Sequence, residues 1–209
     1  MKTKSKVDFE ESTVPFSQEL EAWLKSKQTK TFLSLDEVFG EKTFAILFMF
    51  LMATSALPIP TGGVTDVFAV VTVLFALQMA VGRESLWLPK RWRNMKLNKT
   101  TREKLLPGLL KVLKKIEPFS RPRMLWIFKG RLSNLIIGLS VAVLAASTIT
   151  APPFSGLDTI PALGAVLISS GIVLKDGLIV IVGGIVGACG VGLQVLLGKV
   201  IVEFVSKLF

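Results

Sequence analysis

The sequence predicts an all-α membrane protein with two tandem helical hairpins, a C-terminal transmembrane helix and amphipathic helices in the cytoplasm. Of its 209 residues, 51% are hydrophobic and only 19% are charged, whereas roughly 25% are charged in a typical soluble domain. Five apolar blocks divide the chain, and the excess positive charge lies between them. In water, too little amphipathic sequence would remain to cover these blocks.

The charge is strongly segregated along the chain. Residues 83–131 hold 15 basic and 3 acidic residues, while residues 43–82 contain a single ionisable group, Asp66. Because short loops rich in Lys and Arg stay in the cytoplasm, we expect this basic segment and the N-terminus to be cytoplasmic. The expected organisation is a cytoplasmic N-terminal segment, a first hairpin, a basic cytoplasmic loop, a second hairpin, and a last transmembrane helix with a short tail: 1–42, 43–82, 83–131, 132–176 and 177–209.

The residue inventory excludes several classes of site. The chain has no His, no Tyr and a single Cys, Cys189. His-based triads, His metal sites, Cys-cluster zinc sites and internal disulfides are therefore excluded. No catalytic residue, metal, cofactor or nucleic-acid partner is expected, and we predict that the protein is not an enzyme. The first 42 residues are polar, so no cleavable signal peptide is expected.

Four of the apolar blocks are short for a membrane span. The blocks are Thr43–Leu57, Val67–Val81, Leu135–Ile149, Ile160–Leu174 and Leu178–Gly198. The last can cross a bilayer core of roughly 30 Å, whereas a 15-residue helix reaches only about 22 Å.

The blocks form a weak internal repeat. Shifting the chain by 93 residues aligns residues 44–83 with residues 137–176, with seven identities in forty. Each copy has an apolar run that ends in small polar residues, then a break rich in Pro and Gly, an Asp, and a second apolar run. Proline ends a helix and glycine permits a tight turn, so each copy predicts a hairpin with a broken tip.

Two depths are open for these tips. Each tip is either an ordinary turn across the membrane or a re-entrant break within it, where irregular backbone must be buried or line a cavity. Paired, interrupted segments in two halves point to a transport site. The basic segment favours parallel repeats, because inverted repeats would require an odd number of crossings within it.

The candidate substrate- or ion-binding residues lie at the tips and at the membrane interface. They are Pro58, Pro60, Gly62, Gly63, Asp66, Gln78, Arg83, Pro152, Pro153, Gly156, Asp158, Lys175 and Asp176. Asp66 and Asp158 either cap the following helices or carry a proton, cation or polar substrate. Gln78 either joins helices or contacts substrate. Arg83, Lys175 and Asp176 either anchor the chain at the interface or contact a phosphate headgroup.

Two stretches outside the blocks predict amphipathic helices. Phe16, Leu20, Trp23 and Leu24 share one helical face. Leu residues within 102–117 form a second stripe, with Lys111, Lys114 and Lys115 off that face. Such a helix either lies on anionic headgroups of membrane lipids or packs on the protein itself. Small residues of the last helix, including Gly183, Gly187 and Gly190, predict close packing within the protein or in a homo-oligomer.

The motifs resemble those of the ExoD family. The resemblance is carried by Pro58-Ile59-Pro60-Thr61-Gly62-Gly63, Gln78, Gly82-Arg83, Trp87-Leu88-Pro89, Pro152-Pro153-Phe154, Ile160-Pro161-Ala162 and Lys175-Asp176-Gly177. It covers residues from about 15 to 198. Lys175 departs from the family's Arg-Asp-Gly pattern, which removes bidentate guanidinium geometry there.

The resemblance implies a bacterial inner-membrane protein that serves exopolysaccharide synthesis or export. We expect it to bind or transport a small ion or a lipid-linked intermediate. Two alternatives remain: a non-catalytic scaffold that recruits lipids or polysaccharide-synthesis proteins, and an intramembrane lipid-phosphate hydrolase that uses Asp66 and Asp158.

Overall fold

The computed structural model describes residues 15–26, 31–40, 42–57, 63–83, 85–87, 106–128, 130–151 and 155–208. These residues form helices and no strand, which confirms the all-α class for the described part of the chain. The elements are α1 (Phe16–Lys25), α2 (Phe32–Phe39), α3 (Lys42–Ser55), α4 (Val64–Ala80), α6 (Leu106–Ile116), η2 (Glu117–Phe119), η3 (Leu125–Phe128), α7 (Arg131–Thr150), α8 (Thr159–Leu174) and α9 (Gly177–Leu208).

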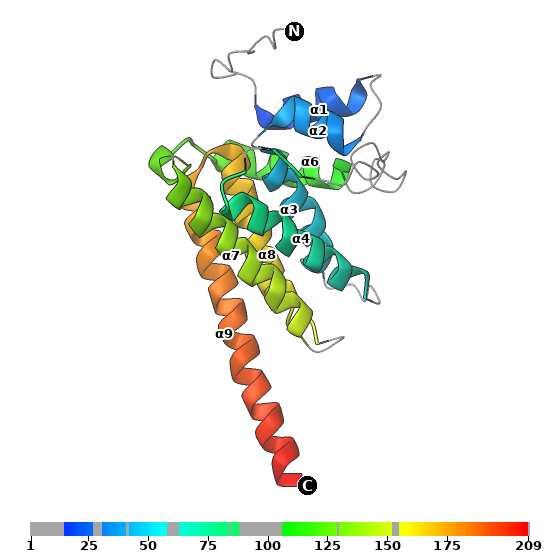
Figure 1. Ribbon diagram of the computed structural model, residues 1–209, viewed down its shortest axis with the longest axis vertical. Coiled ribbons are helices and arrows are strands. Elements are labelled where there is room, and N and C mark those ends of the chain that lie inside the picture. Colours follow the sequence, from blue (N-terminus) through cyan, green and yellow to red (C-terminus); the bar gives the residue numbers. More distant parts are fainter. Residues whose placement is uncertain are drawn as a thin grey trace.

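The centre of the molecule is a bundle of α3, α4, α7 and α8, with α9 packed along α8 (Figure 1). Around the bundle, α3 packs on α4, α4 on α7, α7 on α8, and α8 on α3. A second group, which we call the cap, consists of α1, α2 and α6 and covers one end of the bundle (Figure 1). Helices α3 and α7 end, and α4 and α8 begin, at the opposite end, which we call the distal end.

Small residues allow the helices of the bundle to approach closely. A Cβ on Gly164 of α8 would lie 2.5 Å from the Cα of Gly187 on α9. A Cβ on Gly138 of α7 would lie 2.7 Å from the carbonyl oxygen of Ala76 on α4. Gly183 and Gly187 thus pack within the protein, which is one of the two alternatives that the sequence left open.

Two helices, α7 over Arg131–Thr150 and α9 over Gly177–Gly198, are long and apolar enough to cross a membrane. The apolar helices α3, α4 and α8 are shorter, at 14, 17 and 16 residues. Large apolar side chains face outward on α4, α7 and α9, including Leu74, Val143 and Ile185, which are 56%, 57% and 59% exposed. An apolar outer surface is consistent with a membrane protein, because lipid rather than water is its natural contact.

The cap is held together by a small apolar core. Leu109, Leu110 and Leu113 of α6 are buried, as are Leu20 and Trp23 of α1, and α6 packs on both α1 and α3. The Leu stripe of α6 therefore faces the protein. Residues 102–105, which belong to the sequence-predicted lipid-binding stretch, lie outside the described residues.

Candidate functional site

The first candidate region is the distal end of the bundle. Gly63 directly precedes α4 with φ +88°, and Gly156 lies shortly before α8 with φ +68°. Only glycine adopts this left-handed backbone at little cost, so both residues shape the entry into their helices. The candidates Pro58, Pro60, Gly62, Pro152 and Pro153 lie outside the described residues.

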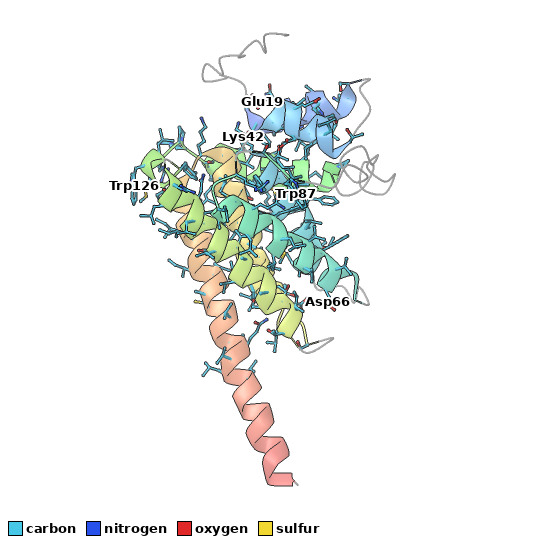
Figure 2. The ribbon with its side chains drawn as sticks, in the orientation of Figure 1. Glu19, Lys42, Asp66, Trp87 and Trp126 are labelled. Carbon is cyan, nitrogen blue, oxygen red and sulfur yellow. The ribbon has the colours of Figure 1, made fainter. Side chains whose placement is uncertain are left out.

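Asp66 and Asp158 both lie at the starts of helices near the distal end. Asp66 is exposed in the first turn of α4, where Gly63 holds the N-cap position (Figure 2). Asp158 holds the N-cap position of α8, but its side chain makes no capping hydrogen bond. Within the described ranges, no hydrogen bond or ion pair joins the two carboxylates. Both carboxylates lie at the positive ends of helix dipoles.

Two hydroxyl groups lie inside the bundle near the same end. Ser55 of α3 is 1% exposed and Thr148 of α7 is 5% exposed. The Thr148 hydroxyl donates to the carbonyl oxygen of Ala145 at 2.8 Å, whereas the Ser55 hydroxyl has no partner among the described residues. Sequence reasoning did not select these two residues. The signal that could have found them is the small polar run that precedes each break.

Gln78 connects α4 to the chain that follows it. Its Oε1 accepts a hydrogen bond from the backbone N–H of Trp87 at 2.9 Å. The backbone N–H of Leu86 in turn donates to Asp36 of α2 at 3.3 Å. Gln78 therefore stabilises the segment that leaves the bundle, and it does not join two bundle helices through this bond. Arg83 lies exposed at this end of α4.

Asp176 is a buried junction at the cap end of α9. It is 2% exposed and accepts hydrogen bonds from the backbone N–H groups of Arg121 and Leu178, both at 3.0 Å, and from the Ser120 hydroxyl at 3.3 Å. The carbonyl oxygen of Arg123 accepts from the N–H of Gly177 at 3.0 Å. Lys175, with φ +54°, ends α8 and turns its side chain to solvent. The structure thus brings Asp176 against the basic segment.

A groove of about 440 Å³ opens beside this junction. Its lining comes from the end of α6 and η2, from Arg123, and from α8 and α9. The lining residues are Lys115, Ile116, Phe119, Arg123, Leu167, Asp176, Leu178, Ile179 and Val182. Most are apolar, and the cations Lys115 and Arg123 come from the segment that carries most of the positive charge.

An ion pair connects the cap helices α1 and α6. Glu21 of α1 lies 2.5 Å from the Lys114 Nζ of α6 and 2.7 Å from the Lys25 Nζ. The hydrogen bond from Lys114, together with that from Lys25, lowers the pKa of Glu21 to about 2. The Glu117 carboxylate accepts from the backbone N–H of Ser17 at 3.1 Å and from its hydroxyl. Over the described ranges, no three acidic or Cys side chains gather as a metal site.

Comparison with known proteins gives a consistent assignment. Residues 16–196 match the family model described as "Exopolysaccharide synthesis, ExoD". The chain is 31% identical over 183 residues to "Protein ExoD" of Rhizobium meliloti (strain 1021), covering 83% of this chain and 73% of that protein. It is 30% identical over 196 residues to "Uncharacterized protein slr1875" of a Synechocystis strain, covering 92% of this chain and 88% of that protein. No solved structure matches.

Proposed function

Because the chain belongs to the ExoD family of exopolysaccharide synthesis, we propose that it acts in exopolysaccharide synthesis or export as a multi-pass inner-membrane protein. The proposed activity is the binding or transport of a small ion or a lipid-linked intermediate at the distal end. Its carboxylates and hydroxyls favour a proton or cation, since these are oxygen ligands and no Lys or Arg of the described residues forms an ion pair with Asp66 or Asp158. The observation that carries the proposal is a correspondence at a shift of 93 residues: Gly63 and Gly156 both have positive φ, and Ser55 and Thr148 are both buried hydroxyls.

The matched backbone at a shift of 93 residues supports a repeat. Gly63 and Gly156 both have positive φ, at +88° and +68°. Gly82 and Lys175, at the ends of α4 and α8, also correspond and also have positive φ, at +84° and +54°. Left-handed backbone is uncommon, so two pairs of corresponding residues with positive φ at helix boundaries support a structural repeat.

The buried positions match at the same shift. Four corresponding pairs are all 0% exposed: Phe48 and Val141, Met52 and Ala145, Ala69 and Ala162, and Thr72 and Ala165. Ser55 corresponds to Thr148, and Thr54 corresponds to Ser147. Thr54 and Ser147 each donate to a carbonyl three residues earlier, at 2.7 Å in both cases. The two carboxylates differ by one position, since Asp158 corresponds to Thr65.

The packing order fits two repeats related by an axis along the bundle. Exchanging α3 with α7 and α4 with α8 leaves the order of contacts around the bundle unchanged. Such an axis places both breaks at one end, as in a parallel repeat, and it brings Ser55 and Thr148 toward the centre. Figure 1 agrees, because α4 and α8 both begin at the distal end.

A contact between α8 and α9 bears on the depth of this end. Gln194 Nε2 donates to the carbonyl oxygen of Leu157 at 2.9 Å, so the start of α8 lies level with Gln194. Gln194 is about 26 Å along α9 from Gly177, and Lys199 follows about 7 Å later. With the basic segment in the cytoplasm, the distal end therefore lies close to the outer interface, within a turn or two of it. This favours hairpin tips near the outer surface of the bilayer rather than at its midplane.

The proposal is for a binding or transport protein rather than an enzyme. The sequence has no His to act as a base, and Asp66 and Asp158 share no hydrogen bond within the described residues. In the proposed mechanism, Asp66 and Asp158 attract the cation or proton at the outer surface, and the buried hydroxyls of Ser55 and Thr148 offer oxygens within the bundle.

Proteoliposomes test this proposal directly. Vesicles loaded with a pH-sensitive or a sodium-sensitive dye receive a potassium diffusion potential, and uptake of protons or sodium is followed with and without the protein. We expect uptake above that of empty vesicles and at least a tenfold loss in Asp66→Asn or Asp158→Asn, because these two carboxylates supply the negative charge that attracts the ion. Glu37→Gln, an exposed acid on α2, is the matched control. Equal uptake in protein-containing and empty vesicles for both ions contradicts the ion proposal.

The exposed cations of the cap favour a second candidate, a non-catalytic scaffold. The Leu stripe of α6 is buried, so Lys111 points outward and is free to meet acidic lipids or polysaccharide-synthesis proteins. The outward small residues Gly184, Ala188 and Gly192 of α9 would suit a second copy of the chain. Loss of polysaccharide output in Lys111→Gln with normal ion uptake would favour the scaffold.

A further inference from the structure

The groove between α6, η2 and α9 combines an apolar floor with a cationic mouth. Leu178, Ile179 and Val182 lie on one face of α9 and run from the cap end along the bundle. Leu178 and Val182 are 46% and 42% exposed, so this face is not covered by the described helices. Leu167 of α8 extends the same floor.

The cations at the mouth are available to a ligand. Lys115 of α6 and Arg123 both line the groove and are exposed, and neither forms an ion pair within the described part of the chain. The neighbouring acids are engaged elsewhere: the Asp176 carboxylate accepts from Ser120, Arg121 and Leu178, and Glu117 accepts from Ser17. The groove lining holds two cations and one carboxylate, so its net charge is positive.

The groove also lies beside aromatic side chains that suit a membrane surface. Phe119 lines it and is 81% exposed. Trp126 of η3, which packs on α9, is 69% exposed at the same end of the bundle (Figure 2). Exposed aromatic rings at the end of an apolar helix are typical of the interface between lipid and water.

We propose that this groove binds one anionic phospholipid of the cytoplasmic leaflet, with its phosphate between Lys115 and Arg123 and an acyl chain along Leu178, Ile179 and Val182. The charge of the mouth selects an anionic headgroup, and the apolar floor selects a lipid over a free phosphate. The volume of about 440 Å³ accommodates a headgroup and the first part of the chains. The site lies at the opposite end from the proposed ion site, so each proposal stands or fails alone.

Native mass spectrometry of the purified full chain tests the proposal, with phosphatidylglycerol and phosphatidylcholine titrated separately. We expect at least a tenfold preference for phosphatidylglycerol. Lys115→Gln and Arg123→Gln should each weaken its binding about fivefold, because a basic residue near the surface contributes roughly that factor. Lys25→Gln, an exposed basic residue of the cap outside the groove, is the matched control. Val182→Trp, which fills the floor and keeps both charges, should weaken phosphatidylglycerol about tenfold.

Several outcomes would overturn the proposal. Equal binding of the two phospholipids contradicts headgroup selectivity. An effect of Lys25→Gln as large as that of Lys115→Gln would mean that the preference comes from the overall charge of the protein and not from the groove. Undiminished binding of phosphatidylglycerol to the Val182→Trp variant contradicts the proposed position of the acyl chain along α9. Competition by millimolar inorganic phosphate would identify free phosphate as the ligand, and polyprenyl monophosphate binding ten times tighter than phosphatidylglycerol would identify a carrier lipid.

Discussion

At the scale of single residues, Asp176 is a buried carboxylate with a structural role. A buried carboxylate is costly unless hydrogen bonds replace its water. Asp176 receives three donors, from Ser120, Arg121 and Leu178. It thereby joins the start of α9 to the segment between the cap and α7. The sequence predicted Asp176 to be an anchor at the membrane interface or a headgroup contact; that role stays a prediction, and these bonds give the carboxylate a structural role within the protein.

Removing this carboxylate should destabilise the protein. Asp176→Ala leaves two backbone N–H groups without their acceptor, so we expect a loss of about 2–4 kcal/mol in the free energy of unfolding. Asp176→Asn keeps one acceptor oxygen and should lose about half as much. Asp158→Ala, whose side chain caps nothing, should change stability by less than about 1 kcal/mol. Chemical unfolding in detergent micelles measures all three, and equal losses for Asp176→Ala and Asp158→Ala would refute the junction.

At the scale of elements, glycine decides how closely α8 and α9 approach. Gly164→Ala would place a Cβ 2.5 Å from the Cα of Gly187, a backbone atom that cannot turn aside. We expect a loss of about 1–3 kcal/mol in stability, as in other overpacked sites. Gly192→Ala on α9 meets nothing within 4 Å and should gain about 0.5–1 kcal/mol from helix propensity. The same unfolding assay compares them, and a gain in both variants would mean that the helices lie further apart.

The helices also show how much of the fold could be predicted from the sequence. The apolar blocks predicted the positions of α3, α4, α7 and α8 to within four residues, because hydrophobic runs bounded by Pro, Gly and charges mark helix ends. The start of α9 was predicted to within one residue, but α9 continues to Leu208, ten residues past the predicted block. The buried partner of α6 could not be predicted, since a Leu stripe identifies a face but not what covers it. Helix α2 was missed, because its capping box pairs Thr31 with Ser34 rather than with the usual Glu or Gln.

The limits were similar for the candidate sites. The tips were predictable because Pro and Gly interrupt two similar runs. The groove could not be predicted, because Val182 is far along the chain from Lys115 and Arg123, and the three meet only when the segment after α6 folds onto Asp176. The hydrogen bond between Gln78 and Trp87 was also unpredictable, because its donor is a backbone N–H, which nearly every residue type has.

At the scale of the whole molecule, the cap and the bundle separate charge from apolar surface. The cap carries the ion pairs of Glu21 and Glu19, while the bundle exposes apolar side chains such as Leu74 and Val143. Helices α3, α4 and α8 are apolar on all sides, which is expected for helices that contact both lipid and protein. One end of the molecule is therefore suited to water and the rest to a bilayer, which is consistent with a membrane protein.

This arrangement predicts the outcome of cysteine labelling. In a Cys189→Ser background, Leu57→Cys after α3 and Ser155→Cys before α8 place one thiol at each break. In a parallel repeat both breaks lie on the same side of the membrane. We therefore expect a membrane-impermeant maleimide to label both variants when it is added to intact cells or right-side-out vesicles. Ser85→Cys, at the cap end of α4 and exposed, should react only from the cytoplasmic side. Labelling of the two breaks from opposite sides would contradict the parallel repeat that we propose from the shared distal end of α4 and α8.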